Sequence, residues 1–204
     1  MPPPRATAAV LAAALTVTVG GCRGARARAE ALRPSEVLIE VLPRSARVEL
    51  DGRPLGAGGG AVASPIAADE HVLRVSAEGY EPEERVLPAG SLDGARIAAA
   101  LRPRGFSSAG AIDYDDAPAL AAAAEWLVAA GEPRDAAEYA ERAIAVDPAV
   151  AVAHRALGDA RARAGEPAAA VAAWGEYLRR SPEAADAAAV ERLMEGARRD
   201  VRAP

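Results

Sequence analysis

The stretch AGEPAAAVAAWGEYLRRSP at residues 164–182 decides the fold of the C-terminal half, because it repeats an earlier stretch, AGEPRDAAEYAERAIAVDP at residues 130–148. The offset between the two copies is constant from the Gly-Glu-Pro triplet to the final proline. In each copy the triplet interrupts a helical pattern and places a proline at the first turn of the next helix. The spacing predicts paired helices over residues 117–200, ended by a capping helix at 183–199 with Leu193 and Met194 buried.

The offset equals the period of the tetratricopeptide (TPR) repeat, which is about 34 residues. The second copy is similar to that family at Leu157-Gly158, Ala170, Trp174 and Pro182. The resemblance implies a solenoid of helix pairs, in which the first helix of each pair lines a concave, protein-binding face. The positions of this chain that match that face are Ala121, Glu125, Val128, Val152, Arg155, Asp159 and Arg163. A merely solvated face is the alternative to a binding face.

Two repeats and a cap are fewer than the three or so repeats expected to be stable alone. We therefore expect packing against the preceding part of the chain, or self-association, to supply the remaining stability.

Between residues 36 and 103 the hydrophobic pattern changes to a period of two. Val37, Ile39 and Val41 alternate with other residues, which predicts a strand buried mainly on one face. Asp51-Gly52 is a tight-turn dipeptide between extended segments. Five or six short strands separated by such turns predict a small antiparallel sandwich or barrel.

This part resembles the PEGA domain, a small β module of bacterial and archaeal cell-surface proteins. The resemblance rests on the segments 46–52, 55–56, 71–75 and 78–80 and on Leu101. Members of that family place Thr-Pro soon after the glycine, whereas this chain has a Gly-rich stretch at 56–60, where we expect a longer and more mobile loop. The resemblance implies adhesion or interaction and no catalysis.

Two ring side chains of this part are candidates for ligand groups. A histidine in a strand without a second histidine or a cysteine nearby is typical of packing or hydrogen bonding, so we assign that role to His71. Tyr80 is expected to close the core of the sandwich.

Residues 1–21 have the pattern of a signal peptide. Arg5 precedes an apolar run from Ala8 to Val19, which is too short to cross a bilayer. The small residues before Cys22 resemble the lipobox of bacterial lipoproteins, which implies attachment of lipid to Cys22 and cleavage after Gly21. The alternative is an ordinary cleaved signal with a cysteine that has no role.

Residues 22–35 are rich in Arg, Ala and Gly and are expected to form a flexible spacer. Arg23 does not resemble the signal that retains lipoproteins in the inner membrane, so the outer membrane is the expected location of the lipid anchor.

Residues 104–116 form the predicted linker between the two modules. Its acidic run, Asp113 to Asp116, lacks the spaced oxygen ligands, the central glycine and the closing glutamate of a calcium loop. A helix N-cap followed by an acidic first turn, which is favourable to the helix dipole, explains the run better.

Composition excludes several functions. All 24 basic residues are arginine, so neither a Schiff-base lysine nor a phosphate-loop lysine exists. The net charge of −5 argues against a nucleic-acid partner, and a single cysteine excludes an intramolecular disulfide. The two histidines lie in different modules, so we expect no enzyme, no cofactor and no metal site.

Together these patterns predict an α+β chain of two modules, a small antiparallel β-sandwich at 36–103 and a TPR-like helical solenoid at 117–200 with its capping helix. The expected function is that of a lipid-anchored cell-envelope protein that binds or scaffolds a protein partner without catalysis. The alternatives are a structural or adhesive surface protein that contacts cell-wall polymer, or an accessory of envelope assembly or of a signalling kinase. The oligomeric state stays open.

Overall fold

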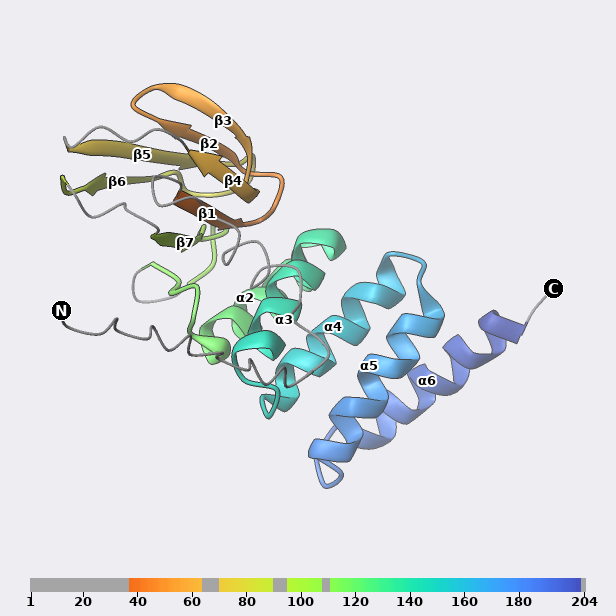
Figure 1. The fold of residues 1–204 in the computed structure, drawn as a ribbon. Coiled ribbons are helices and arrows are strands. Elements are labelled where there is room, and N and C mark those ends of the chain that lie inside the picture. The colour runs from red at the N-terminus through yellow and green to blue at the C-terminus, as the bar shows by residue number, and fades with distance from the viewer. Residues whose placement is uncertain (1–36, 64–69, 90–94, 108–110, 203–204) are drawn as a thin grey trace, which may run out of the picture.

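The computed structural model describes residues 37–63, 70–89, 95–107 and 111–202. In these residues seven strands are followed by five helices, so the mixed α+β class is confirmed (Figure 1). The predicted signal peptide (1–21), Cys22 and the predicted spacer (22–35) lie outside the described residues.

The strands form two sheets. The first has the order β4-β1-β7 and the second the order β3-β2-β5-β6. Their bounds are β1 (Val37–Leu42), β2 (Arg47–Leu50), β3 (Arg53–Ala57), β4 (Gly59–Ala63), β5 (His71–Ser76), β6 (Glu83–Leu87) and β7 (Arg96–Ala100).

The described strands make two sheets and no barrel, so the barrel alternative is excluded. One detail of the predicted sandwich is wrong: the pairing is not antiparallel throughout, because β1 runs parallel to β7, with Ile39 opposite Ile97. The chain returns from the second sheet to β1 twice, first as β4, which is antiparallel to β1, and after β6 as β7, which lies on the other side of β1 and is parallel to it.

The Gly-rich stretch, expected to be a mobile loop, instead forms the end of β3, Gly58 and the start of β4. Gly58 is buried between the two sheets: its N–H donates to Ala46 O at 2.8 Å, and its carbonyl accepts from Val41 N at 2.9 Å. A Cβ on Gly58 would lie 2.8 Å from that of Val41. Glycine is therefore needed here because a neighbouring backbone approaches closely.

The strand β1 is buried on both faces, contrary to the expectation of one. Ile39 and Val41 point into the sandwich core, and Leu38 and Leu42, at the alternating positions, are buried as well. The turn after β2 is as predicted, with positive φ angles at Asp51 and Gly52.

The helices come in pairs. Their bounds are α2 (Ala117–Ala130), α3 (Pro133–Val146), α4 (Ala151–Arg163), α5 (Pro167–Arg180) and α6 (Ala187–Arg202). The offset of the sequence repeat returns in the helix starts, since α4 begins as far after α2 as α5 begins after α3. The predicted N-cap is confirmed at α2, where the side chain of Asp116 accepts a hydrogen bond from Ala119 N at 3.0 Å; the predicted acidic first turn is wrong, because the acidic run ends at the cap.

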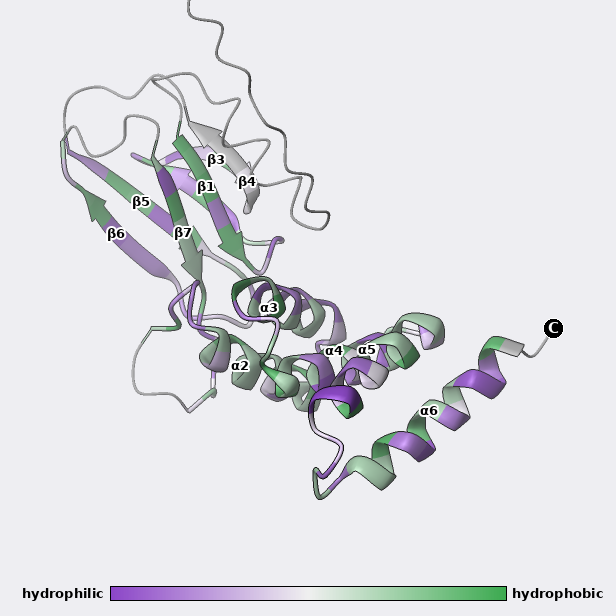
Figure 2. Ribbon diagram, turned by 60° about the horizontal axis from the view of Figure 1, so that its bottom comes forward, coloured by the Kyte–Doolittle hydropathy of each residue, from purple (hydrophilic) through white to green (hydrophobic). Residues whose placement is uncertain are grey.

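The last helix, α6, packs against α5 along one stripe. Val190, Met194 and Ala197 are buried in a small cluster with Trp174 and Tyr177. Leu193 is 46% exposed, so its predicted burial is wrong. It lies at the margin of this stripe, whose members are spaced by four and three positions. Figure 2 shows the alternation of hydrophobic and hydrophilic residues along α6.

The two parts of the chain share one hydrophobic core. The main cluster of buried residues runs from β1 through Ile112, in the predicted linker, to α2, α3 and α4. Ile112 also forms an isolated bridge with Ala100, at the end of β7. The second half of the predicted linker thus belongs to the packed structure.

Candidate functional site

The predicted partner-binding residues lie on α2 and α4, the first helices of the two pairs, which pack side by side. They differ in exposure. Ala121 and Val128 are 2% and 7% exposed, so their side chains pack inside and offer little surface to a partner. Glu125, Val152 and Arg163 are exposed.

Arg155 and Asp159, one helical turn apart on α4, are half-buried and bound to each other. Arg155 Nε donates to Asp159 Oδ2 at 3.0 Å. The same guanidinium forms an ion pair with Asp186, which precedes α6. Arg155 therefore links the second pair of helices to the capping helix, and is already engaged before any partner arrives.

Both aspartates of this network also bind aromatic side chains of α5. Trp174 Nε1 donates to Asp159 Oδ1 at 2.9 Å, and the Tyr177 hydroxyl donates to Asp186 Oδ1 at 2.5 Å. Each carboxylate thus accepts from one aromatic and from Arg155. The polar groups of this network thus bond to one another, and they stabilise the packing of α4, α5 and α6.

Sequence reasoning found Arg155 and Asp159 but missed the role of Asp186. The available signal was its position just before the capping helix, where a carboxylate is favourable. The contact with Tyr177 was not readable, because it depends on the angle at which α6 returns onto α5.

Glu125 differs from its neighbours on this face. It has no hydrogen-bond or ion-pair partner among the described residues. Although the residue is exposed, desolvation by the surrounding protein raises the pKa of its carboxyl group; nearby Asp159 raises the pKa further, and Arg155 opposes the shift. The face therefore offers the carboxyl group of Glu125, which is unpaired among the described residues, and, on the neighbouring helix, the exposed apolar side chain of Val152.

Arg163 forms a hydrogen bond with the C-terminal end of α2. Its Nη1 donates at 2.7 Å to the carbonyl of Val128, in the last turn of that helix, which also accepts from Gly131 N at 3.3 Å. The side chain is exposed but bound within the chain.

Both histidines pack and form hydrogen bonds, the role expected for His71. His71 is buried, and its Nδ1 donates to Asp51 Oδ2 at 2.7 Å. The other oxygen of Asp51 accepts from Val72 N at 2.9 Å, so the pair fastens the turn after β2 to β5. His154 donates from Nε2 to Pro148 O at 3.1 Å.

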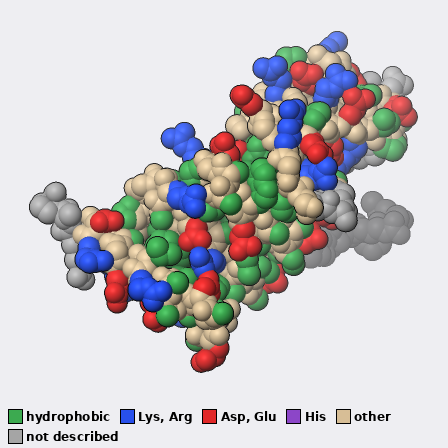
Figure 3. Space-filling model, turned by 180° about the vertical axis from the view of Figure 1, so that it is seen from behind, with side chains coloured by type: hydrophobic (Ala, Val, Ile, Leu, Met, Phe, Trp, Pro, Cys, Tyr) green, Lys and Arg blue, Asp and Glu red, His purple; other side chains and the backbone are tan. Residues whose placement is uncertain are grey.

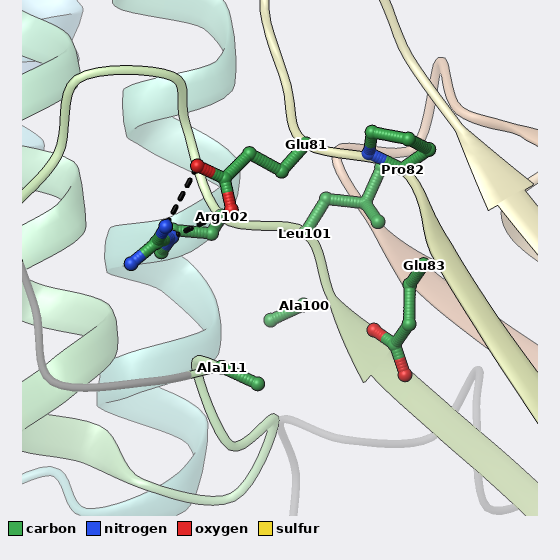
Figure 4. A pocket seen from close by; sticks show the side chains of 7 residues that line it. All are labelled: Glu81, Pro82, Glu83, Ala100, Leu101, Arg102 and Ala111. Carbon is green, nitrogen blue, oxygen red and sulfur yellow. Dashed lines mark hydrogen bonds and ion pairs between the residues drawn. The ribbon is translucent and has the colours of Figure 1, made fainter.

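A cavity of about 210 Å³ lies where β6 begins and β7 ends (Figure 4). Its volume is below the roughly 300 Å³ at which small-molecule sites begin. Arg102 forms two hydrogen bonds with Glu81 at its rim, at 2.7 and 2.9 Å. The residues that line it are Glu81, Pro82, Glu83, Ala100, Leu101, Arg102 and Ala111.

Within the described ranges, no three His, Cys, Asp or Glu side chains are arranged to hold a metal ion. Nor does any helix of those ranges combine the length and apolar character that a bilayer span requires. Seen from behind, Arg and Asp or Glu side chains are interspersed over the surface (Figure 3).

The sequence matches no protein-family model, and a comparison with curated proteins finds no match either.

Proposed function

We propose that this chain is a lipid-anchored protein of the bacterial cell envelope, in which TPR-like helices bind or scaffold a protein partner and a PEGA-like module connects them to the anchor. The observation that carries the proposal is the constant offset between the two helix pairs, which equals the period of TPR repeats. The polar character of α6, where Glu191, Glu195 and Arg198 are exposed, suits the capping helix of such an array.

The face on α2 and α4 is the proposed contact with the partner. Of the seven candidate residues, Glu125 and Val152 are the two that are exposed and have no hydrogen-bond or ion-pair partner among the described residues. We therefore assign the direct contact to these two positions, and a positioning role to Arg155 and Asp159.

A photo-crosslinking amino acid at Val152, introduced in living cells, tests this contact. The matched control is Ala172, an exposed position on α5. A protein adduct specific to position 152 supports the proposal. Equal adducts at both positions, or none at 152, would remove the assignment of this face.

Metabolic labelling with palmitate tests the anchor separately. The wild-type chain is expected to be labelled and to fractionate with membranes, and Cys22→Ala is expected to lose both properties. A wild-type chain that stays unlabelled and soluble would eliminate the lipid anchor, whatever the crosslinking shows. Retention of purified chain on cell-wall polysaccharide, without a protein adduct, would instead favour the adhesive alternative.

A further inference from the structure

The side of α3 that meets the β part carries four large polar residues at helical spacing. Asp135, Glu138, Tyr139 and Arg142 are separated by three, one and three positions, so they share one face of the helix. We call them the junction face of α3. Each of them bonds to a residue outside the helical pairs.

Tyr139 is the centre of the junction face. The side chain is fully buried, and its hydroxyl lies 3.2 Å from the carbonyl oxygen of Leu42 and 2.5 Å from that of Leu101. These carbonyls lie at the ends of β1 and β7, the two strands that run parallel. The hydroxyl of Tyr139 therefore donates to a carbonyl at the end of each of the two strands.

A second tyrosine extends the contact from the β side. The ring of Tyr80 stacks on that of Tyr139 with centroids 6.4 Å apart, and its hydroxyl donates to Asp135 Oδ2 at 2.7 Å. Burial and the nearby carboxylate raise the pKa of Tyr80, so the hydroxyl stays protonated as a donor. Tyr80 belongs to the main core, as expected, and its hydroxyl also reaches α3 across the junction.

The edges of the junction are fixed by charge-assisted bonds. Arg44 N donates to Glu138 Oε2 at 2.7 Å. Arg142 Nε donates to Tyr114 O at 3.0 Å, and its guanidinium lies 4.3 Å from the centroid of the Tyr114 ring and forms an ion pair with Asp115. The segment before α2 is thereby bound to α3.

The internal repeat shows that the junction face is particular to the first helix pair. At the repeat offset, the equivalents of its four residues in the second pair are Ala169, Ala172, Ala173 and Glu176. The two copies share the Gly-Glu-Pro triplet that interrupts the helices and the small residues that pack between them. They differ at the positions that contact the β part. This pattern is expected if the first copy is adapted to a neighbour that the second copy lacks.

We infer that the β part serves as the N-terminal cap of the helical array, and that the two parts unfold as one cooperative unit. A short array needs a cap at each end because its terminal helices otherwise expose apolar surface. Here α6 covers the C-terminal end, and the ends of β1 and β7 cover α3. The β part therefore has a role within its own chain, whatever it contacts outside.

Hydrogen exchange of the full chain, followed by mass spectrometry under conditions where exchange reports opening equilibria, tests the coupling. Val48→Ala is the perturbation, because Val48 is fully buried in β2 and belongs to the β part. In one cooperative unit the exchange rates of the slowest amides of α3 rise by the same factor as those of β5, about tenfold or more. A rise in β5 with unchanged rates in α3 would overturn the inference.

Two further variants keep the outcome readable. Ile97→Val is a milder perturbation of the same core, for use if Val48→Ala does not fold. It must raise the exchange rates of α3 and β5 by equal factors. Val86→Ala, at a position 53% exposed on β6, is expected to change neither helix nor strand. A rise in β5 without a rise in α3 in either destabilised variant would overturn the inference, and unchanged rates in Val86→Ala would tie the rise to the loss of buried core.

Discussion

At the scale of single residues, the Tyr139 hydroxyl contributes most to the junction. In Tyr139→Phe the ring and its stacking on Tyr80 remain, and the Leu42 carbonyl keeps its hydrogen bond from Leu101 N, but the Leu101 carbonyl loses its side-chain donor. We expect the free energy of unfolding to fall by about 1–3 kcal/mol, the cost of a buried polar group left unsatisfied. Urea denaturation followed by circular dichroism measures the change.

The matched control is Tyr114→Phe. The guanidinium groups of Arg96 and Arg142 lie 5.4 and 4.3 Å from the centroid of the Tyr114 ring, and the Tyr114 hydroxyl forms no hydrogen bond with a described residue. Stability should therefore be nearly unchanged. Equal losses in the two variants would mean that hydroxyl bonding is not what Tyr139 contributes.

A second prediction at this scale concerns pH. The hydrogen bond from His71, and then that from Val72 N, hold the pKa of Asp51 below its ordinary value. A depressed carboxyl pKa stabilises the fold above the unfolded pKa of about 3.9, and this contribution is lost as the pH falls through the folded pKa. Asp51→Asn tolerates the positive φ but lacks the charge.

The urea midpoint of the wild type is thus expected to fall more steeply than that of Asp51→Asn below about pH 4. Parallel curves for the two proteins would contradict the assigned role of the Asp51 carboxylate.

At the scale of elements, the pairing of α4 with α5 depends on Gly158. A Cβ at this position would lie 2.3 Å from Cδ1 of Trp174, a buried ring held by its bond to Asp159. Gly158→Ala is expected to destabilise the chain by about 1–3 kcal/mol, as overpacking does. Thermal unfolding followed by tryptophan fluorescence reports the change.

The control, Gly175→Ala on α5, sets a Cβ 3.9 Å from Met194 Cε, an ordinary contact. It should stabilise the chain by about 0.5–1 kcal/mol, because glycine is a poor helix former. Destabilisation by both variants would show that close approach to Trp174 is not the cause.

The attachment of α6 depends on Asp186 in a comparable way. Asp186→Ala removes the acceptor of the Tyr177 hydroxyl and the ion-pair partner of Arg155. We expect faster hydrogen exchange in α6 and, because the helices and the β part are inferred to unfold as one unit, at the slowest amides of α2 and α3 as well. Glu183→Ala, an exposed residue without an ion pair among the described residues, should leave exchange in α6 as it was.

At the scale of the whole molecule, many ion pairs lie on the surface, and in nearly all of them at least one side chain is exposed; in Arg74–Glu84 both are. Exposed pairs contribute at most about 1 kcal/mol each, and often nothing measurable. The melting temperature should therefore change by only a few degrees between about 50 and 500 mM NaCl. A fall of more than about 10 °C would mean that surface charge holds the fold together.

The helical half was predictable because its signals are local. The helix bounds follow from the Gly-Glu-Pro triplets, from the proline that ends each copy and from the constant offset between the copies. Asp116 indicated the N-cap of α2. The strands were largely found from alternation and turns. The parallel pairing of β1 with β7 was not, since no local pattern records which distant strand is the neighbour.

The binding face was predictable only as a set of helix positions. Spacing placed Ala121 and Val128 correctly on α2, but their burial follows from how closely α4 packs there. The junction face of α3 was readable in principle, because Asp135 to Arg142 departs from the second copy at each contact position. Its meaning required the location of Leu42 and Leu101, which tertiary structure alone provides.

The parallel pair of β1 and β7 also bears on the order in which the chain folds. The first sheet is complete only when Ile39 lies opposite Ile97, which is far away in the sequence, whereas each helix pair forms between segments that are adjacent in sequence. Non-local pairing slows folding, because the loop is closed before its contacts can compensate the lost entropy. We therefore expect the part of this chain that is synthesised first to mature last, with the helices already formed when Tyr139 finds its two carbonyls.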